Sequence, residues 1–124
     1  MIIGLGIDLV EIARMKEKIE SGSGFKEYAF SPAEIQYCDN KKNRFEHYAA
    51  CFAAKESFLK ALGTGWAEGI AFNEIELIHD AEGKPIINLS GGTREKIDLL
   101  KIMGISVSLS HVKSIAGAVV ILEK

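Results

Sequence analysis

The stretch FEHYAACFAAKESFLKAL, residues 45–62, decides the fold and is followed directly by Gly63. It contains no proline and many strong helix formers, and a glycine at its end suits the positive φ of a helix C-cap. The sequence therefore predicts a long helix. At about 100° per residue, its larger apolar residues share one arc, which consists of Phe45, Tyr48, Cys51, Phe52, Phe58, Leu59 and Leu62.

Lys55 falls inside this apolar arc. An ammonium group that is buried without a partner is costly, so an ordinary core helix rarely places a lysine there. Two interpretations are open. Lys55 snorkels out of the core while Glu56 and Lys60 form a weak i,i+4 pair at the surface, or this side of the helix faces a polar cleft that contains an anion.

Composition limits the class of protein. A chain of 124 residues, 48% hydrophobic and 26% charged, fits one globular domain with a modest core. A net charge of −2 argues against a dedicated nucleic-acid binder, and no apolar run approaches the ~20 residues that span a bilayer. The apolar start contains Asp8 and lacks a basic region, which makes it a poor signal peptide. Cys38 and Cys51 make neither a disulfide framework nor a metal knuckle, so we expect a cytoplasmic protein with reduced thiols.

The first strand has an unusual face. Residues 2–12 are rich in β-forming side chains, and Ile3, Leu5, Ile7 and Leu9 alternate with Gly4, Gly6 and Asp8. This alternation places Asp8 on a thin, glycine-lined face, where another backbone or a ligand can approach closely. A carboxylate in the middle of a strand is uncommon. The alternative for Asp8 is a turn at the strand end or a helix N-cap.

The rest of the chain alternates helices with local hairpins. A helix over 13–20 ends at the SGSG of 21–24, residues 25–30 are ambiguous, and Ser31, Pro32 and Glu34 begin another helix with a capping box. Strands are predicted over 73–79, 85–89, 105–111 and 114–122, and a helix over 91–103 with Ile97, Leu100 and Met103 on one face and Gly104 as C-cap. This order predicts a single α+β domain over 1–124, with a largely antiparallel sheet packed on the long central helix.

Two acidic residues occupy unusual positions, Asp8 on the glycine-lined strand and Glu56 at the edge of the central helix. Mg²⁺ typically takes one or two protein carboxylates and completes its coordination with water and substrate phosphates. Lys55 and Lys60 beside such a pair, with His111 close by, would suit a polyphosphate ligand. The glycines at 63, 65 and 69 do not form a P-loop, which needs a strand before it and a lysine within it.

Four segments carry a family resemblance. They are GLGIDLVEIARM at 4–15, FAAKESFLKALGTG at 52–65, EGKP at 82–85 and SLSHVKSIAGAVV at 108–120. In this order and spacing they resemble the holo-[acyl-carrier-protein] synthase family, the short trimeric 4′-phosphopantetheinyl transferases. The resemblance covers nearly the whole chain. It implies transfer of the 4′-phosphopantetheine arm of coenzyme A to a serine of apo acyl carrier protein, with release of 3′,5′-ADP, in support of fatty acid biosynthesis.

The resemblance also implies roles for individual residues. Asp8 and Glu56 match the two Mg²⁺-binding carboxylates, Lys60 matches the lysine that steadies the pyrophosphate or leaving group, and Lys55 matches a motif lysine whose head would reach a phosphate. Asp8, Glu56 and Lys60 are therefore the expected catalytic residues. We hypothesise that Glu56, directly or through a metal-bound water, accepts the proton of the carrier's serine.

The remaining coenzyme A contacts implied by the family come from several segments. We assign Lys42 to the 3′-phosphate, Gly83 to Pro85 to the adenine, and Ser110 and His111 to the phosphates, with Gly63 also at the site. A histidine at a strand end has a purely structural alternative. The family assembles as a homotrimer with active sites at subunit interfaces.

Two departures from the family pattern concern the partners. The position before Phe52, often basic in the family, is Cys51 here, so we expect one of the family's phosphate or carrier contacts to be missing. The segment expected to dock the acidic carrier carries few cations, so steering is expected to be weaker. The docking candidates are Arg14, Lys16, Lys18, Phe25 and Lys26.

Two other classes of function compete with this hypothesis. One is a non-catalytic module that binds a nucleotide or coenzyme A through a trimer, and the other is a Mg²⁺-dependent phosphotransferase that acts on a small molecule. A metal pair beside Lys60 argues against pure binding, and the lack of a P-loop or kinase-type glycine loop argues against the second. Mg²⁺-dependent release of 3′,5′-ADP separates both from the transferase.

Overall fold

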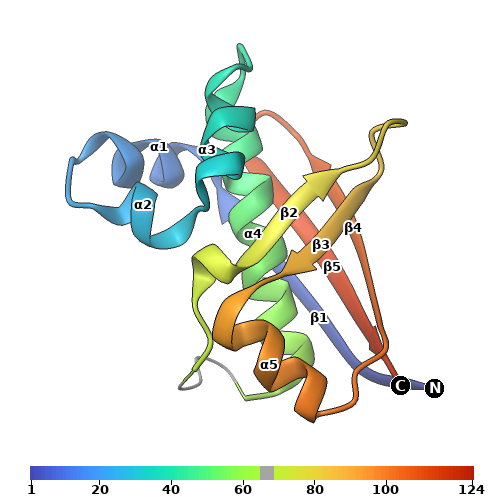
Figure 1. The fold of residues 1–124 in the computed structure, drawn as a ribbon. Coiled ribbons are helices and arrows are strands. Elements are labelled where there is room, and N and C mark those ends of the chain that lie inside the picture. Colours follow the sequence, from blue (N-terminus) through green and yellow to red (C-terminus); the bar gives the residue numbers. More distant parts are fainter. Residues whose placement is uncertain (65–68) are drawn as a thin grey trace.

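Helix α4 (Arg44–Leu62) runs through the middle of the molecule, with a sheet on one side and a hairpin on another (Figure 1). The computed structural model describes residues 1–64 and 69–124. The elements that flank α4 are β1 (Ile2–Glu11), α1 (Ile12–Glu20), α2 (Phe25–Ala29), α3 (Pro32–Asp39), the 3₁₀ turn η1 (Phe72–Glu74), β2 (Ile75–His79), β3 (Pro85–Leu89), α5 (Gly91–Leu99), β4 (Gly104–His111) and β5 (Ile115–Glu123).

The strands form two antiparallel sheets. One has the order β1-β5-β4, and the other is the β2–β3 hairpin. In the larger sheet Asp8 lies opposite Ala118, and Ser110 lies opposite Gly117. The two termini lie side by side (Figure 1), where the Met1 amino group donates to the carbonyl of Lys124 at 2.8 Å. The predicted α+β class with an antiparallel sheet on a central helix is confirmed.

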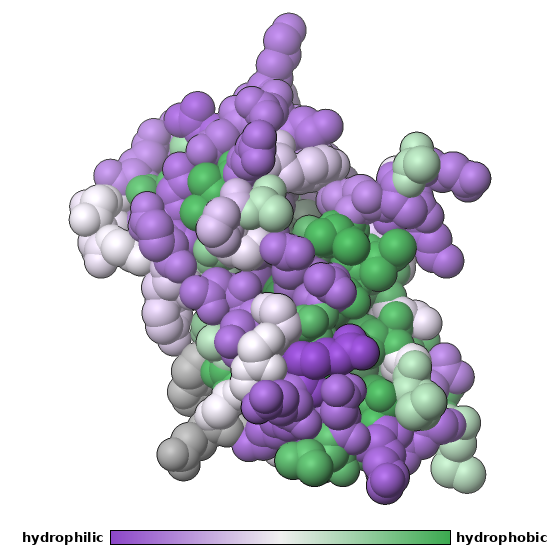
Figure 2. All heavy atoms as spheres, in the orientation of Figure 1, coloured by the Kyte–Doolittle hydropathy of each residue, from purple (hydrophilic) through white to green (hydrophobic). Residues whose placement is uncertain are grey.

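Polar and apolar side chains are distributed unevenly over the surface. In the view of Figure 2, polar side chains cover most of α1 to α3, whereas apolar side chains gather over the β2–β3 hairpin. Ile78 and Ile86 are the exposed large apolar residues of that hairpin. No helix of the described residues is both long and apolar enough to cross a bilayer.

Two glycines allow β1 to contact the backbone of α4. A Cβ atom built at Gly4 would lie 2.0 Å from the Ala61 carbonyl oxygen, and one at Gly6 would lie 2.0 Å from that of Ser57. Every residue other than glycine carries a Cβ, so none fits there without a shift of the helix or the strand. The predicted close approach to the glycine-lined face is confirmed, and the approaching group is the central helix itself.

Helix α4 is buried around most of its circumference, beyond the single apolar arc that the sequence indicates. Its small residues face the sheet, and the hydroxyl of Ser57 donates to the carbonyl of Ala118 at 2.9 Å. Gly63 ends the helix with φ 78°, as the C-cap prediction requires. The buried residues of α4 are Tyr48, Ala49, Ala50, Cys51, Ala53, Ala54, Lys55, Ser57, Phe58, Leu59 and Ala61.

Several element boundaries in the structure differ from those that the sequence predicts. Helix α5 ends at Leu99, so the prediction that it extends to Met103 with Gly104 as C-cap is wrong. Lys101 has φ 60°, and the Met103 N–H donates to the Glu123 carbonyl at 2.9 Å, which adds this segment to the sheet instead. Only Ile97 of the predicted apolar face is buried, since Leu100 and Met103 are exposed.

Other local features agree more closely with the sequence. The capping box at the start of α3 is present, and the ambiguous residues 25–30 contain the short helix α2. Strand β2 begins at Ile75, because the two residues before it belong to η1. Of the predicted glycine-rich turn, Gly65 lies outside the described residues.

Replacing Gly6 with alanine should destabilise the protein by about 1–3 kcal/mol, because the added methyl group meets the Ser57 carbonyl. Chemical denaturation followed by circular dichroism measures this change. Gly92→Ala is the matched control, since among the described residues outside its own helix a Cβ at Gly92 meets the Gly69 carbonyl oxygen at 3.7 Å, an ordinary contact distance. Equal stability of Gly6→Ala and wild type would contradict the tight contact.

Candidate active site

Asp8 and Lys60 form an ion pair where β1 crosses α4. The Lys60 ammonium donates to Asp8 Oδ1 at 2.9 Å and to the carbonyl oxygen of Ile7 at 3.0 Å. Asp8 is half-buried because it belongs to the β1 face that packs on the helix. Lys60 lies one turn beyond Glu56, but no ion pair between these two occurs in the described part of the chain. The predicted i,i+4 surface pair is therefore replaced by a pair between strand and helix.

Glu56 lies close enough to Asp8 for the charge of Asp8 to shift its pKa. Partial burial raises the pKa of its carboxyl group, the negative charge of Asp8 raises it further, and Lys60 and Lys18 act in the opposite direction. Two carboxylates that repel one another in this way form a suitable donor set for a divalent cation. Since no cluster of three or more His, Cys, Asp or Glu ligands is found among the described residues, a metal ion here would need oxygens from water or a ligand, as Mg²⁺ accepts.

A hollow of about 200 Å³ opens beside Asp8, between the end of β1, α1 and α4. Met15 and Phe52 provide apolar lining, and Arg14 and Lys18 provide positive charge. The Lys18 ammonium lies 5.4 Å from the centre of the Phe25 ring and 5.9 Å from that of Phe52. Arg14, Lys18 and Phe25 of the predicted docking set therefore gather beside the carboxylates.

The other two docking candidates are engaged elsewhere. The Lys16 ammonium lies 5.7 Å from the centre of the Phe45 ring, near the start of α4. Lys26 forms an ion pair with Asp39 at 3.1 Å. Both cations thus have neighbours outside the hollow beside Asp8, which leaves Arg14 and Lys18 as the cations of that surface.

Lys55 does not reach the cleft, which corrects both interpretations of this residue. Its side chain is fully buried, and its ammonium donates to Glu34 Oε1 at 2.7 Å and to the carbonyls of Phe72 at 2.7 Å and Ile75 at 2.5 Å. All three N–H donors are used. Lys55 therefore neither snorkels to solvent nor offers a donor to a phosphate of coenzyme A.

The sequence predicts Glu34 only as part of a capping box, and not as the buried partner of Lys55. Its Oε1 also accepts from the Ser31 N–H at 2.9 Å, and its Oε2 accepts from the Leu77 N–H at 2.9 Å and the Cys51 thiol at 2.7 Å. The signal was the lysine in an apolar arc, which demands a buried acidic partner. Cys51 points at this pair, and burial is the main cause that raises its thiol pKa.

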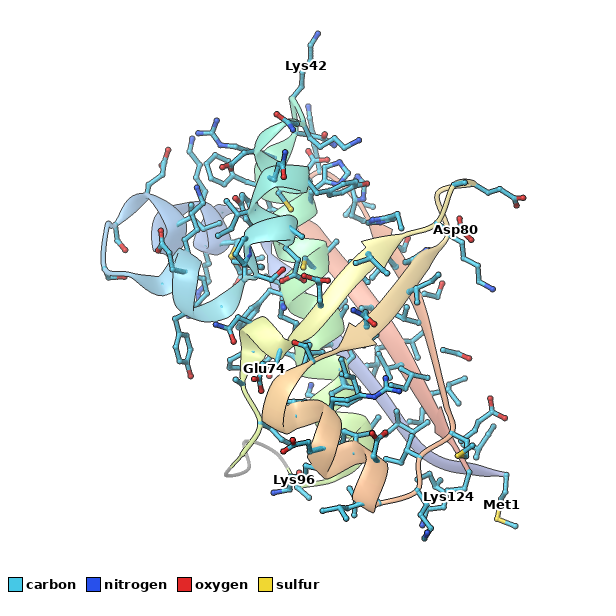
Figure 3. All side chains as sticks on the ribbon, viewed as in Figure 1. Met1, Lys42, Glu74, Asp80, Lys96 and Lys124 are labelled. Atoms are coloured by element: carbon cyan, nitrogen blue, oxygen red, sulfur yellow. The ribbon has the colours of Figure 1, made fainter. Side chains whose placement is uncertain are left out.

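The remaining coenzyme A candidates lie away from Asp8. Lys42 projects outward from the turn before α4 (Figure 3), and His111 Nε2 lies 3.1 Å from Glu46 Oε2 near the start of the same helix. Glu46 and Glu56 are both on α4, and their separation in the chain corresponds to about 15 Å along a helix. Ser110 is exposed beside His111, whereas Gly83 and Pro85 belong to the β2–β3 turn and the start of β3.

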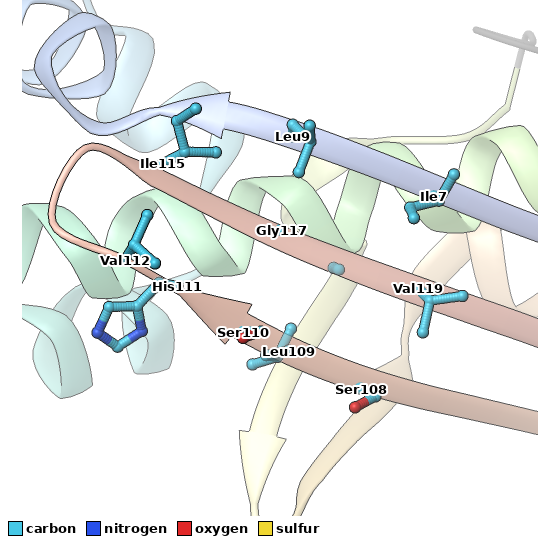
Figure 4. A pocket seen from close by; sticks show the side chains of 11 residues that line it. Ile7, Leu9, Ser108, Leu109, Ser110, His111, Val112, Ile115, Gly117 and Val119 are labelled. Atoms are coloured by element: carbon cyan, nitrogen blue, oxygen red, sulfur yellow. The ribbon is translucent and has the colours of Figure 1, made fainter.

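The outer face of the larger sheet is apolar and open. Leu5, Ile7 and Leu9 are 64%, 65% and 68% exposed, on the side of β1 opposite to Asp8. A hollow of about 360 Å³ lies on this face, and Ile7, Leu9 and Val119 line it together with Ser110 and His111 (Figure 4). The predicted phosphate-binding end of β4 therefore adjoins an uncovered apolar surface.

Comparison with known proteins identifies the family of this chain. Residues 4–110 match the family model of the 4′-phosphopantetheinyl transferase superfamily. The chain belongs to that superfamily. It is 48% identical to the holo-[acyl-carrier-protein] synthase of Syntrophus aciditrophicus over 99% of this chain and 97% of that protein. It is 45% identical to the synthase of Cytophaga hutchinsonii over 100% of this chain and 99% of that protein.

Solved structures of the superfamily have the same fold. The Neisseria meningitidis holo-[acyl-carrier-protein] synthase superposes with a TM-score of 0.93 at 31% identity and covers 100% of both chains. The Helicobacter pylori synthase, solved in complex with coenzyme A, has a TM-score of 0.84 at 35% identity and covers 96% of this chain and 99% of that chain. The predicted family is confirmed, and the protein is a phosphopantetheinyl transferase.

Replacing Lys55 with methionine should destabilise this transferase by about 3–5 kcal/mol, because Glu34 would remain as a buried charge without its cation. The free energy of unfolding in urea measures the loss. Lys55→Met combined with Glu34→Gln should cost less than the sum of the single changes. Strict additivity would contradict the direct pairing of the two side chains.

Proposed function

We propose that phosphopantetheine transfer takes place in the cleft between β1 and α4, with Mg²⁺ held by Asp8 and Glu56. The reaction moves the 4′-phosphopantetheine group of coenzyme A to a serine of apo acyl carrier protein and releases 3′,5′-ADP, in agreement with the family and the names of the relatives. One observation carries the choice of site, namely the convergence of Asp8, Glu56 and Lys60 where β1 meets α4.

Each of these three residues has a separate task. A bound Mg²⁺ would neutralise negative charge on the pyrophosphate of coenzyme A. Lys60 supplies a mobile ammonium at the edge of the cleft, suited to the charge that develops on the leaving group. Glu56 accepts the proton of the carrier's serine, directly or through water, and its raised pKa favours that role because a more basic carboxylate takes a proton more readily.

A homotrimer would complete the site. Within one chain, the cations and turns proposed for coenzyme A lie apart from Asp8, and the apolar face of β1 is uncovered. A neighbouring subunit seated on that face would bury Leu5, Ile7 and Leu9. We propose that it also brings its contacts for the coenzyme next to Asp8 and Glu56, the contacts being Lys42, Gly83, Pro85, Ser110 and His111, with Gly63 at the end of α4.

The acyl carrier protein would dock over α1 and α2. Arg14 and Lys18 line the hollow beside Asp8, and Phe25 lies under Lys18 as an apolar contact. Complementarity between these cations and an acidic carrier would guide association, with Lys16 and Lys26 as flanking charges. We further propose that residues 1–124 act as one transferase domain in the cytoplasm, where the holo-carrier would support fatty acid biosynthesis.

Incubation of this protein with apo acyl carrier protein, coenzyme A and Mg²⁺ should add one phosphopantetheine group to the carrier, as measured by intact mass. EDTA and Asp8→Ala should both abolish the gain, because each removes the metal. Glu56→Gln should lower turnover by about 100-fold or more while coenzyme A binding falls far less. Equal loss of turnover and binding would restrict Glu56 to holding the metal.

Two results would favour other functions. Binding of coenzyme A without modification of several carriers would indicate a non-catalytic module. Transfer of a phosphoryl group to a small molecule, without 3′,5′-ADP, would indicate a different phosphotransferase.

Replacing Leu5 with glutamate should convert the trimer into monomers and abolish transfer, because a charge on the uncovered face of β1 cannot be buried between subunits. Sedimentation velocity measures the change in mass. Leu99→Glu is the matched control, since Leu99 is exposed on α5 and should leave the trimer intact. A wild-type protein that sediments as a monomer would contradict the proposed assembly.

A further inference from the structure

Lys60 already occupies one of the two carboxylates proposed to hold the metal. Its ammonium lies 2.9 Å from Asp8 Oδ1, and the carbonyl of Ile7 fixes it from the same strand at 3.0 Å. Both acceptors belong to β1, so the lysine crosses from α4 to the strand and covers one side of the Asp8 carboxylate. A divalent cation that binds this oxygen would meet a positive charge in hydrogen-bond contact with it.

The two partners differ in exposure. The Asp8 side chain is 19% exposed and belongs to a strand that is packed against α4, whereas the Lys60 side chain is 55% exposed. Lys60 also has a long flexible stem in the last turn of the helix. The ammonium can therefore leave Asp8 without any change in the backbone, but the carboxylate has little freedom to follow it.

We propose that Lys60 is a resident counter-ion that competes with the metal for Asp8 and that an incoming pyrophosphate draws it away. This inference rests on the proposed metal site. Before the ligands arrive, the ammonium offsets the repulsion between Asp8 and Glu56. When a pyrophosphate enters, its oxygens offer Lys60 a stronger anionic partner, and Asp8 is released. Binding of the metal and of the coenzyme is coupled through the movement of this one side chain.

Direct binding of Mn²⁺, followed by electron paramagnetic resonance of the free ion at one fixed pH, tests the competition without turnover. In the absence of coenzyme A, Lys60→Met should bind Mn²⁺ about three- to tenfold more tightly than wild type. Lys60→Arg, which keeps the charge, should stay within about twofold of wild type. Coenzyme A should tighten Mn²⁺ binding more in wild type than in Lys60→Met, because only wild type has a cation to displace.

Lys18→Met controls for the general electrostatic field. Lys18 also lowers the pKa of Glu56, but its ammonium lies over the rings of Phe25 and Phe52. Its removal should change Mn²⁺ affinity by less than about twofold. A similar gain in Lys18→Met and Lys60→Met would overturn the proposal, since the effect would then come from net charge alone.

Two further outcomes separate this inference from the site on which it rests. If Asp8→Asn lowers Mn²⁺ affinity but Lys60→Met binds no more tightly than wild type, the metal site stands and the competition is refuted. If Asp8→Asn binds Mn²⁺ as well as wild type does, Asp8 is not a metal ligand. That result would refute both the proposed metal site and the proposed competition by Lys60. Thermal unfolding in EDTA confirms that each variant is folded.

Discussion

The contact between the backbones of β1 and α4 is the constraint on which the rest of this structure depends. The carbonyl oxygens of Ser57 and Ala61 occupy the positions where side chains of residues 4 and 6 would otherwise begin. This approach brings the strand close enough for Asp8 to meet a lysine on the helix. The Asp8–Lys60 ion pair therefore depends on the absence of side chains at residues 4 and 6 as well as on its two charged groups.

Lys55 and Glu56 are adjacent on α4 but have different surroundings. Lys55 points into the core, where it joins α3, η1 and β2 through Glu34 and two backbone carbonyls. Glu56, rotated by about 100°, lies on another side of the helix, where the charge of Asp8 raises its pKa. The Lys55–Glu34 pair has all its donors and acceptors satisfied, and it fixes the rotation of the helix because any turn about the helix axis would leave a buried charge without a partner. The orientation of Glu56 follows from that fixed rotation.

The larger sheet also has two different faces. Its inner face packs on α4 through glycine and alanine, whereas its outer face exposes large aliphatic side chains of β1. The same alternation that directs Asp8 inward directs Leu9 outward, since neighbouring residues of a strand point to opposite faces. Asp8 and the exposed aliphatic residues Leu5, Ile7 and Leu9 therefore lie on opposite faces of the sheet.

The sequence by itself determined the local elements and the identity of the unusual residues. The capping box of α3, the glycine that ends α4 and the alternation along β1 are local patterns, and each is present in the structure. Asp8 and Glu56 were recognisable because a carboxylate is out of place in a strand interior or at the edge of a core helix. These signals depend on residues within a few positions of one another, which is the range over which backbone geometry is set.

Only the tertiary structure decided which charges meet. Glu34 on α3 pairs with Lys55 on α4, and Lys60 pairs with Asp8 of β1 although Glu56 is nearer to it in the sequence. The end of α5 was likewise decided by the pairing of Met103 with the far end of the chain. Such pairings depend on how distant segments pack, because electrostatic and hydrogen-bond energies depend on separation in space, which the order of residues does not record.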